Sequence, residues 1–494
     1  MEQVASGLKQ PQLRIPLDPR AKLRHRFAPR LAAKTGARTT RFDHLLIIAT
    51  IVLLPLQEQI SIVAGSMSGL SFMFLLFGVI GGYLALTRPH AILKAARQPL
   101  FLTAYGLLAV GFVFESTSPY TSYLELQRYA FMVGGGIIVA ALCRDRRAVL
   151  AALYGYALSG TWLSLFLFLS FYGSFGANAA SNLYDATTIR GSIFSENWLE
   201  TGLNTIAFII AQAAVVALAL ALTSRSPLQR RLFFGILMLC AVATFLPMSR
   251  SGILVAGLAG TALIYPSKGK RFRAVAAIGA LAACIFMWAP RAAITRLWSS
   301  MDSSYFSSMS SPEASDDADA RSFLYAAALE HLPEYVTRGV GAGNFWNRWG
   351  MTHGFSPHRG VSGAHNSFVQ VTIYWGIGGL LGLLCVTWQL LRCVPRRFGT
   401  DPLSLACFGI AVSLVLWLLF MHNIYSKEFS LGFGLLAACR LWIWPKGVVI
   451  PLPGHGVRQN NHLRFPGSSG PRSFGYNTSF ASPKLRIIPR DDGG

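Results

Sequence analysis

The chain has 494 residues, of which 53% are hydrophobic and only 13% are charged, and its mean hydropathy is +0.44. Soluble globular proteins carry about 25% charged residues. This composition argues against a soluble enzyme, a disordered protein and a fibrous repeat. Long apolar runs recur along the whole sequence and predict a protein that crosses a membrane many times.

The charge balance is strongly basic, with 44 Lys and Arg against 21 Asp and Glu and a net charge of +23. In a soluble domain this would indicate nucleic acid as a partner. In a membrane protein, basic residues gather in the cytoplasmic loops, so we expect no nucleic-acid partner. The seven cysteines show no CxxC spacing, which indicates neither a structural zinc site nor a disulfide framework.

The apolar runs predict an all-α, polytopic membrane helical bundle with about twelve transmembrane helices. Several runs are shorter than the roughly 20 residues that a full crossing needs. The predicted spans are 43–63, 68–87, 99–114, 129–143, 148–172, 203–222, 232–248, 252–266, 274–290, 367–391, 403–421 and 429–445.

Loops rich in Lys and Arg alternate with loops that have few, and this pattern predicts how the chain is oriented in the membrane. With the N-terminus inside, 34 of the 44 Lys and Arg fall on the inner side, which predicts that both termini are cytoplasmic. Nine of the ten outer ones are Arg, whose planar fork binds phosphate in a bidentate way. The outer set therefore indicates a site for an anionic ligand, unless each member pairs with an outer carboxylate or a lipid phosphate. The ten are Arg128, Arg190, Arg250, Arg291, Arg296, Arg321, Arg338, Arg348, Arg359 and Lys427.

The spans and loops divide the chain into five parts. A basic cytoplasmic tail covers 1–42, nine helices form a membrane bundle over 43–290, and a large outer loop covers 291–366. Three further helices follow over 367–445, and a Pro/Gly/Ser-rich basic tail covers 446–494. We expect both tails to be disordered and to lie against anionic membrane lipids.

The outer loop is the only insert large enough for a structure of its own. Acidic residues precede an apolar-periodic stretch, Ala320 to Val336, which predicts a helix that Pro333 bends or ends. A glycine-rich segment follows, Gly339 to Gly343, and it allows close backbone approach. The loop closes with His365 and Asn366, directly before the span 367–391.

Two arginines on the outer side are candidate ligands for a phosphate group. Arg250 lies at the tip of a hairpin between two short spans. The short helices would sink this tip below the surface, where an arginine is costly without a partner; the alternative is that it extends to the interface. Arg321 begins the loop helix beside three acidic residues, so the alternative there is a local salt bridge.

His365 is the candidate base. A neutral imidazole at the outer end of a membrane helix accepts a proton from a hydroxyl nucleophile; the alternative is an interfacial histidine bonded to backbone. Asn366 would orient the imidazole or a substrate. Asp317 and Asp319 spell D-x-D, a metal-binding triplet, but acids at a helix start have an ordinary electrostatic explanation. We therefore expect no metal.

These motifs, taken in order, resemble the O-antigen ligase and O-antigen polymerase superfamily of bacterial membrane glycosyltransferases. The resemblance covers about residues 200–440 by motif, and the order and spacing of the motifs carry it. The motifs are Ser249-Arg250-Ser251-Gly252, Arg321, Gly339-Val340-Gly341-Ala342-Gly343-Asn344-Phe345, His365-Asn366-Ser367-Phe368 and Gly376-Ile377-Gly378-Gly379.

The resemblance implies a GT-C-like protein of the bacterial inner membrane with its active site on the periplasmic face. Such enzymes move glycan from an undecaprenyl-diphosphate carrier to an acceptor hydroxyl without metal, nucleotide or other cofactor. By position, Arg250 and Arg321 would bind the diphosphate and His365 would activate or position the hydroxyl. Asn366, Arg338, Arg128, Gly341 and Gly343 would contribute to substrate binding, Arg128 on charge and side alone.

The acceptor is not determined by these motifs, because the superfamily includes ligases that use lipid A core and polymerases that use a growing polysaccharide. We predict a ligase-like glycosyltransferase, with an exopolysaccharide or O-antigen polymerase as the alternative within the class. The alternative from another class is a polysaccharide transporter or flippase. Transporters carry ionisable residues at the bilayer midplane, whereas the polar groups here gather on one face.

Overall fold

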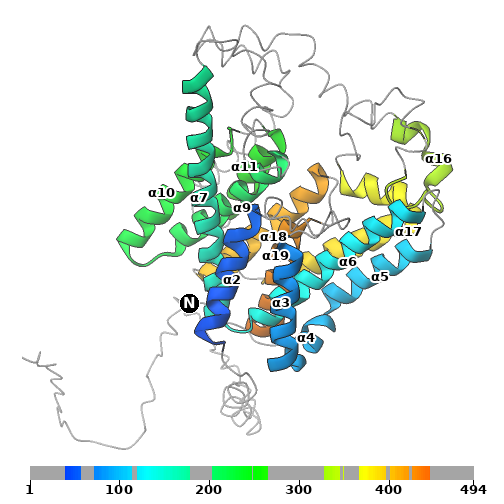
Figure 1. The fold of residues 1–494 in the computed structure, drawn as a ribbon, viewed down its shortest axis with the longest axis horizontal. Coiled ribbons are helices and arrows are strands. Elements are labelled where there is room, and N and C mark those ends of the chain that lie inside the picture. Colours follow the sequence, from blue (N-terminus) through cyan, green and yellow to red (C-terminus); the bar gives the residue numbers. More distant parts are fainter. Residues whose placement is uncertain are drawn as a thin grey trace, which may run out of the picture. The chain divides into compact units, whose positions relative to one another are not determined.

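The computed structural model describes the parts of the chain that form the helical body. All of them fall within one unit, residues 1–450, and every regular element among them is a helix (Figure 1). The described residues are 39–56, 72–113, 119–178, 203–246, 249–264, 327–344, 349, 366–395, 401–421 and 426–444.

The helices follow the apolar runs of the sequence. In chain order they are α2 (Arg41–Leu53), the 3₁₀ turn η1 (Leu54–Leu56), α3 (Phe72–Thr87), α4 (Pro89–Ala96), α5 (Pro99–Val113), α6 (Pro119–Leu142), α7 (Arg146–Asn178), α9 (Leu203–Thr223), α10 (Pro227–Ala243), α11 (Arg250–Ile264), α16 (Leu332–Tyr335), α17 (Ser367–Arg392), α18 (Pro402–Phe420), α19 (Lys427–Ala438) and the π-helical turn η5 (Cys439–Ile443).

Four helices within these residues are long and apolar enough to cross a membrane: Arg146–Leu169, Asn204–Thr223, Ser367–Arg392 and Pro402–Phe420. A fifth span results if α3 and α4, which meet at 113°, are taken together. The helices confirm the all-α polytopic class. Twelve spans stay a prediction, because the span expected at 274–290 lies outside the described residues.

Helix α9 forms the centre of one half of the bundle. It packs against α7, α10, α11 and α18, and its alanine-rich sequence is buried almost throughout from Ile206 to Ala221. Small side chains of this kind let neighbouring helices approach closely. Large apolar side chains such as Leu86, Val113 and Leu228 are instead exposed, as expected of surfaces that face lipid.

Several helix boundaries differ from the sequence prediction. α6 begins at Pro119, within the predicted outer segment 115–128, and α7 continues to Asn178, beyond its predicted end. The predicted loop 88–98 contains α4, and α10 begins at Pro227. All but α7 begin at proline, whose fixed φ and missing N–H suit the first helical position. Hydropathy locates the apolar core of a helix but not its polar ends.

The loop helix predicted at Ala320–Val336 is described only from residue 327 onwards. Residues 327–330 are helical, the helix is interrupted at His331, and α16 follows. Pro333 lies in the first turn of α16. Because proline has no backbone N–H to continue the preceding helix, a bend at this place is the expected result.

Candidate functional site

The described part of the loop 291–366 docks into a break in helix α17. The backbone at Trp375 and Gly376 is not helical, with φ +61° and ψ −155° at Gly376. This frees backbone groups that the loop then binds: Val340 N–H donates to the Ile373 carbonyl at 2.9 Å, and Gly341 N–H donates to the Tyr374 carbonyl at 2.9 Å. Segment 336–344 and the α17 break therefore form one interlocked unit, which we call the glycine interlock.

The return contact completes the interlock. Ile377 N–H, just after the break, donates to the Val336 carbonyl at 2.7 Å. Every backbone polar group that the break releases inside an apolar bundle needs such a partner. The interlock thus satisfies the broken helix and, in the same step, fixes the loop to it.

Glycine is required on both sides of this contact. A Cβ on Gly339 would lie 2.3 Å from the Tyr374 carbonyl oxygen, and one on Gly376 would lie 2.6 Å from the Thr337 carbonyl oxygen. Both distances are far below van der Waals contact, and the neighbours are backbone atoms that have little room to move. Gly339, Gly341 and Gly343 also have φ between +75° and +82°, a region that other residues rarely adopt.

The glycine interlock also contacts the outer end of α6. Ser122 donates to the Ala342 carbonyl at 3.1 Å, and the buried Asn344 amide donates to Ser122 at 3.2 Å. Three residues further along α6, Glu125 binds Arg128 at 2.9 Å. Arg128 thus lies near the loop that carries Gly341 and Gly343, although they are more than 200 residues apart in sequence.

Arg338 lies within the interlock segment and is exposed. Its backbone nitrogen lies 2.9 Å from the position that a Cβ on Gly376 would take, so its main chain is fixed against the α17 break. Gly341 has its N–H engaged by α17, which makes it a residue that shapes the loop. The interlock therefore presents Arg338 from a rigid support.

A second polar group joins the ends of four helices. Ser249, before α11, donates to Asn204 of α9 at 2.7 Å and contacts Ser251 at 3.0 Å. Ser251 lies 3.9 Å from the sulfur of Met421 at the end of α18. Ser367, the first residue of α17, donates to the Met421 carbonyl at 2.7 Å. We call this group the helix-end cluster.

The helix-end cluster brings together two motifs that are distant in sequence. Arg250 lies between the two cluster serines as the first residue of α11. Asn366 caps α17, and its side-chain oxygen accepts from the N–H groups of Phe368 and Val369 at 2.9 and 3.2 Å. The starts of α11 and α17 are therefore neighbours across Met421. A helix N-terminus carries partial positive charge, which suits an anionic ligand.

The remaining predicted site residues lie outside the described residues. His365 directly precedes the described Asn366, and Arg321, Asp317 and Asp319 precede residue 327; the side chain of Arg250 is also outside this description. Within the described ranges, no three metal-ligating side chains come together.

Three of the residues in the interlock and the helix-end cluster were not predicted from the sequence. Ser122, Asn204 and Met421 gave no local signal, because their roles depend on which helix ends meet. The break in α17 did have a signal in retrospect, namely Gly376 within an otherwise helical apolar run. Such a glycine marks a place of close backbone approach.

Comparison with protein families shows that residues 235–384 match the O-antigen ligase family. Comparison with curated protein sequences found no match. The family match confirms the resemblance to the O-antigen ligase and polymerase superfamily, and it supports a function of that type in a membrane-embedded, glycosyltransferase-like enzyme. The matched region runs from α10 to α17 and contains Arg250, Arg321 and His365; Arg128 precedes it.

Proposed function

We propose that this O-antigen ligase-like membrane protein transfers glycan from an undecaprenyl-diphosphate carrier to an acceptor hydroxyl on the periplasmic face of the bacterial inner membrane. The observation that carries the proposal is the family match over 235–384, the region that holds the three residues to which we assign the chemistry. The helix-end cluster supports it, because it joins the α11 start at Arg250 to the α17 start that follows His365.

The donor diphosphate would bind at the start of α11. Arg250 and Arg321 would each hold its oxygens with a guanidinium fork, and the partial positive charge of the helix N-terminus would add to the attraction. When the sugar leaves, negative charge grows on the diphosphate. Fixed positive groups at that position stabilise the transition state more than the bound donor.

The acceptor would be activated by His365. The acceptor oxygen forms a bond to the anomeric carbon as the bond from that carbon to the diphosphate oxygen breaks, and the hydroxyl proton passes to the imidazole. Asn366 is a positioning residue in this scheme, because its side chain caps α17 and thereby fixes the backbone that carries His365.

The glycine interlock would hold the other side of the substrate. Arg338 would take part because it is an exposed residue of the interlock segment, and Arg128 because it lies on α6 near Gly343. No metal or other cofactor enters this scheme. A polymerase uses the same steps with a growing polysaccharide in place of lipid A core, so the acceptor alone separates the two functions.

The test is transfer by purified protein in detergent, with lipid-linked glycan as donor. Lipid A core and a second lipid-linked chain are offered separately as acceptors. We expect Arg250→Ala, Arg321→Ala and His365→Asn to abolish transfer while the proteins still insert into membranes. Arg225→Ala, which removes an exposed arginine between α9 and α10, is the control and should transfer normally. Wild-type transfer by the Arg321 and His365 variants would refute the proposed mechanism.

A further inference from the structure

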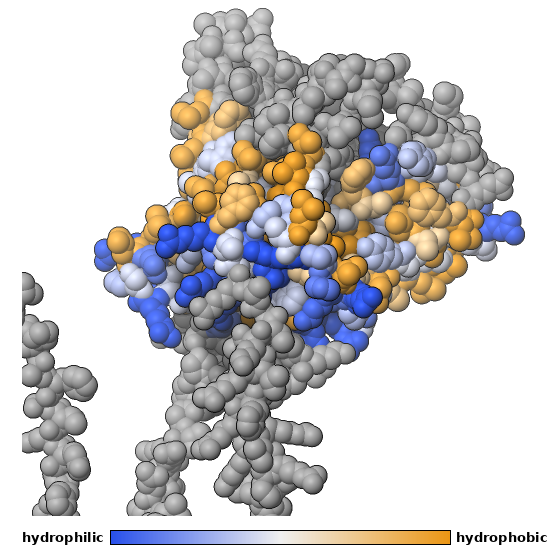
Figure 2. All heavy atoms as spheres, turned by 60° about the horizontal axis from the view of Figure 1, so that its bottom comes forward, coloured by the Kyte–Doolittle hydropathy of each residue, from blue (hydrophilic) through white to orange (hydrophobic). Residues whose placement is uncertain are grey.

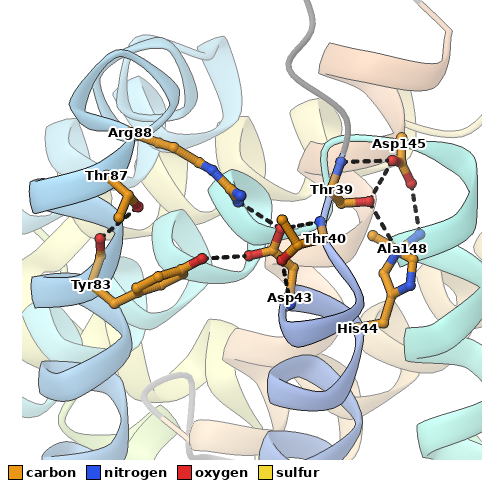
Figure 3. Close-up of polar contacts among 9 residues, drawn as sticks. All are labelled: Thr39, Thr40, Asp43, His44, Tyr83, Thr87, Arg88, Asp145 and Ala148. Carbon is orange, nitrogen blue, oxygen red and sulfur yellow. Dashed lines mark hydrogen bonds and ion pairs between the residues drawn. The ribbon is translucent and has the colours of Figure 1, made fainter.

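A second polar region lies at the other ends of the helices, on the side that the charge pattern assigns to the cytoplasm. Its centre is Asp43, in the first turn of α2, whose side chain is fully buried. The carboxylate accepts from Arg88 at 2.7 Å, from the Tyr83 hydroxyl at 3.2 Å and from Thr40 N–H at 2.6 Å (Figure 3). Three donors therefore occupy most of its acceptor positions.

Asp145 is the second carboxylate of this region and is similarly occupied. It accepts from the N–H of Thr39 at 3.1 Å, from the Thr39 hydroxyl, and from Ala148 N–H at 2.9 Å (Figure 3). Burial alone would raise the pKa of Asp145, but these hydrogen bonds outweigh it and hold the pKa below its usual value. Asp145 is therefore a saturated, ionised carboxylate.

Arg144 directly precedes Asp145 and is close enough to feel the charge of both carboxylates, but it donates a hydrogen bond to neither. Its Nε and Nη2 atoms are buried and have no hydrogen-bond partner in the part of the chain that the structure describes. These two atoms form one edge of the guanidinium, the edge that binds an oxyanion through two parallel hydrogen bonds. Burial, and then the neighbouring Arg88, lower the pKa of Arg144, and the charges of Asp43 and Asp145 offset this only in part.

The end of α6 does not account for this arrangement. A cation near a helix C-terminus is stabilised by the last carbonyls, but other groups bind two of them here. The Ala140 carbonyl accepts from the Trp442 indole at 2.9 Å, and the Val139 carbonyl accepts from Cys143 N–H at 2.9 Å. Neither the nearby carboxylates nor these two carbonyls therefore partner the Arg144 edge.

Exposed apolar side chains lie on the two helices that carry Asp43 and Tyr83. Val79 and Leu86 on α3 are 62% and 88% exposed, and Phe42 and Leu45 on α2 are 54% and 65% exposed. Phe42 also contacts Tyr83 edge to face, with ring centroids 5.5 Å apart. In Figure 2 an apolar flank meets a band of hydrophilic residues on this side of the molecule. A ligand with a charged head and apolar chains matches that boundary.

We propose that Arg144, with Arg88 beside it, binds the phosphate of an anionic phospholipid headgroup, whose acyl chains lie along the exposed faces of α2 and α3. Phosphate offers the two oxygens that the Arg144 edge requires, and its negative charge relieves the repulsion between the two guanidinium groups. Anionic lipids are concentrated at cytoplasmic membrane surfaces. This site is separate from the proposed transfer site and does not depend on the proposed function.

The experiment measures lipid retention by the purified full-length protein. Wild type, Arg144→Gln and the control Arg147→Gln are stripped with detergent and incubated with phosphatidylglycerol, phosphatidylcholine or inorganic phosphate. Bound lipid is counted by native mass spectrometry, and the thermal unfolding midpoint is measured in the same samples. Arg147 is a suitable control because it lies three residues from Arg144, in the first turn of α7, and is exposed.

We expect wild type and Arg147→Gln to retain phosphatidylglycerol and to unfold at a higher temperature with it. Arg144→Gln should retain roughly tenfold less, since it loses a charge-assisted bidentate contact. Equal retention by Arg144→Gln, or equal retention of phosphatidylcholine by wild type, would overturn the proposal. A midpoint shift with inorganic phosphate as large as with phosphatidylglycerol would identify free phosphate and overturn the lipid assignment.

A third variant covers the case in which Arg144→Gln does not fold. Arg144→Lys keeps the charge but cannot form the bidentate contact. We expect it to fold and to retain clearly less phosphatidylglycerol than wild type. Retention equal to wild type would show that charge alone is sufficient and would overturn the bidentate site.

Discussion

The glycine interlock predicts the effect of a single methyl group at Gly376. Its φ and ψ lie in a region that is almost exclusive to glycine, where another residue costs about 1–3 kcal/mol. The added Cβ would also lie 2.6 Å from the Thr337 carbonyl oxygen. The backbone must then move and weaken the hydrogen bond from Ile377 to Val336, which contributes about 0.5–1.5 kcal/mol. Gly376→Ala should therefore disfavour the docked loop by about 2–4 kcal/mol, which at the lower figure is roughly 30-fold in population.

Two measurements check this prediction. The first is glycan transfer, which should fall in Gly376→Ala because Arg338 loses its rigid support. The second is labelling of Ala342→Cys with a membrane-impermeant maleimide. Ala342 is 1% exposed, so a cysteine there should react in the Gly376→Ala background and stay protected otherwise; protein without the Ala342 substitution corrects for the native cysteines.

The matched control is Gly106→Ala in α5. A Cβ at this position meets nothing within 4 Å, so we expect normal transfer and a stability that is unchanged or raised by up to about 1 kcal/mol, owing to the better helix propensity of alanine. Full transfer by Gly376→Ala, with Ala342→Cys still protected, would refute the reasoning, since the docked loop would then tolerate a side chain where the geometry leaves no room.

Two further predictions follow from individual contacts. Asp43→Ala leaves Arg88 without its buried partner and should lower the unfolding free energy by about 3–5 kcal/mol, measured by thermal unfolding in detergent. The double variant Asp43→Leu with Arg88→Met removes both charges and should lower the unfolding free energy by less. An equal decrease in the two proteins would contradict the ion-pair explanation. Asn366→Ala removes the cap of α17 and should lose about 1 kcal/mol of helix stability, whereas Asn366→Ser keeps the cap and should keep most of the transfer activity. Loss of transfer in both variants would indicate that Asn366 contacts the substrate directly.

The fold class was predictable because long apolar runs indicate helices that cross a membrane. Helices such as α9 and α18 match their predicted spans closely, since their ends coincide with the change from apolar to polar sequence. Helix α4 was missed because it is only eight residues long, and it lies where charged residues predict a loop. Hydropathy indicates which segments lie in an apolar environment, but it does not indicate where the backbone of a polar segment is helical.

The site was only partly predictable for a different reason. The Gly339–Gly343 segment was identified as a place of close approach, but its partner, the α17 break, was not. Contacts such as Ser251 to Met421 and Ser367 to Met421 join helix ends that are 54 to 170 residues apart. No periodicity within one segment specifies such pairs, because they depend on how the whole bundle packs.

The central claim is that this protein transfers lipid-linked glycan to an acceptor. The most direct measurement is the surface-polysaccharide profile of a strain that lacks the gene, with the wild-type gene and His365→Asn returned in parallel. We predict that glycan on lipid A core disappears while full-length polymer stays on its lipid carrier, and that only the wild-type gene restores the profile. Loss of polymer with a single repeat unit left on the core would indicate the polymerase instead. An unchanged profile in the deletion strain would contradict the claim.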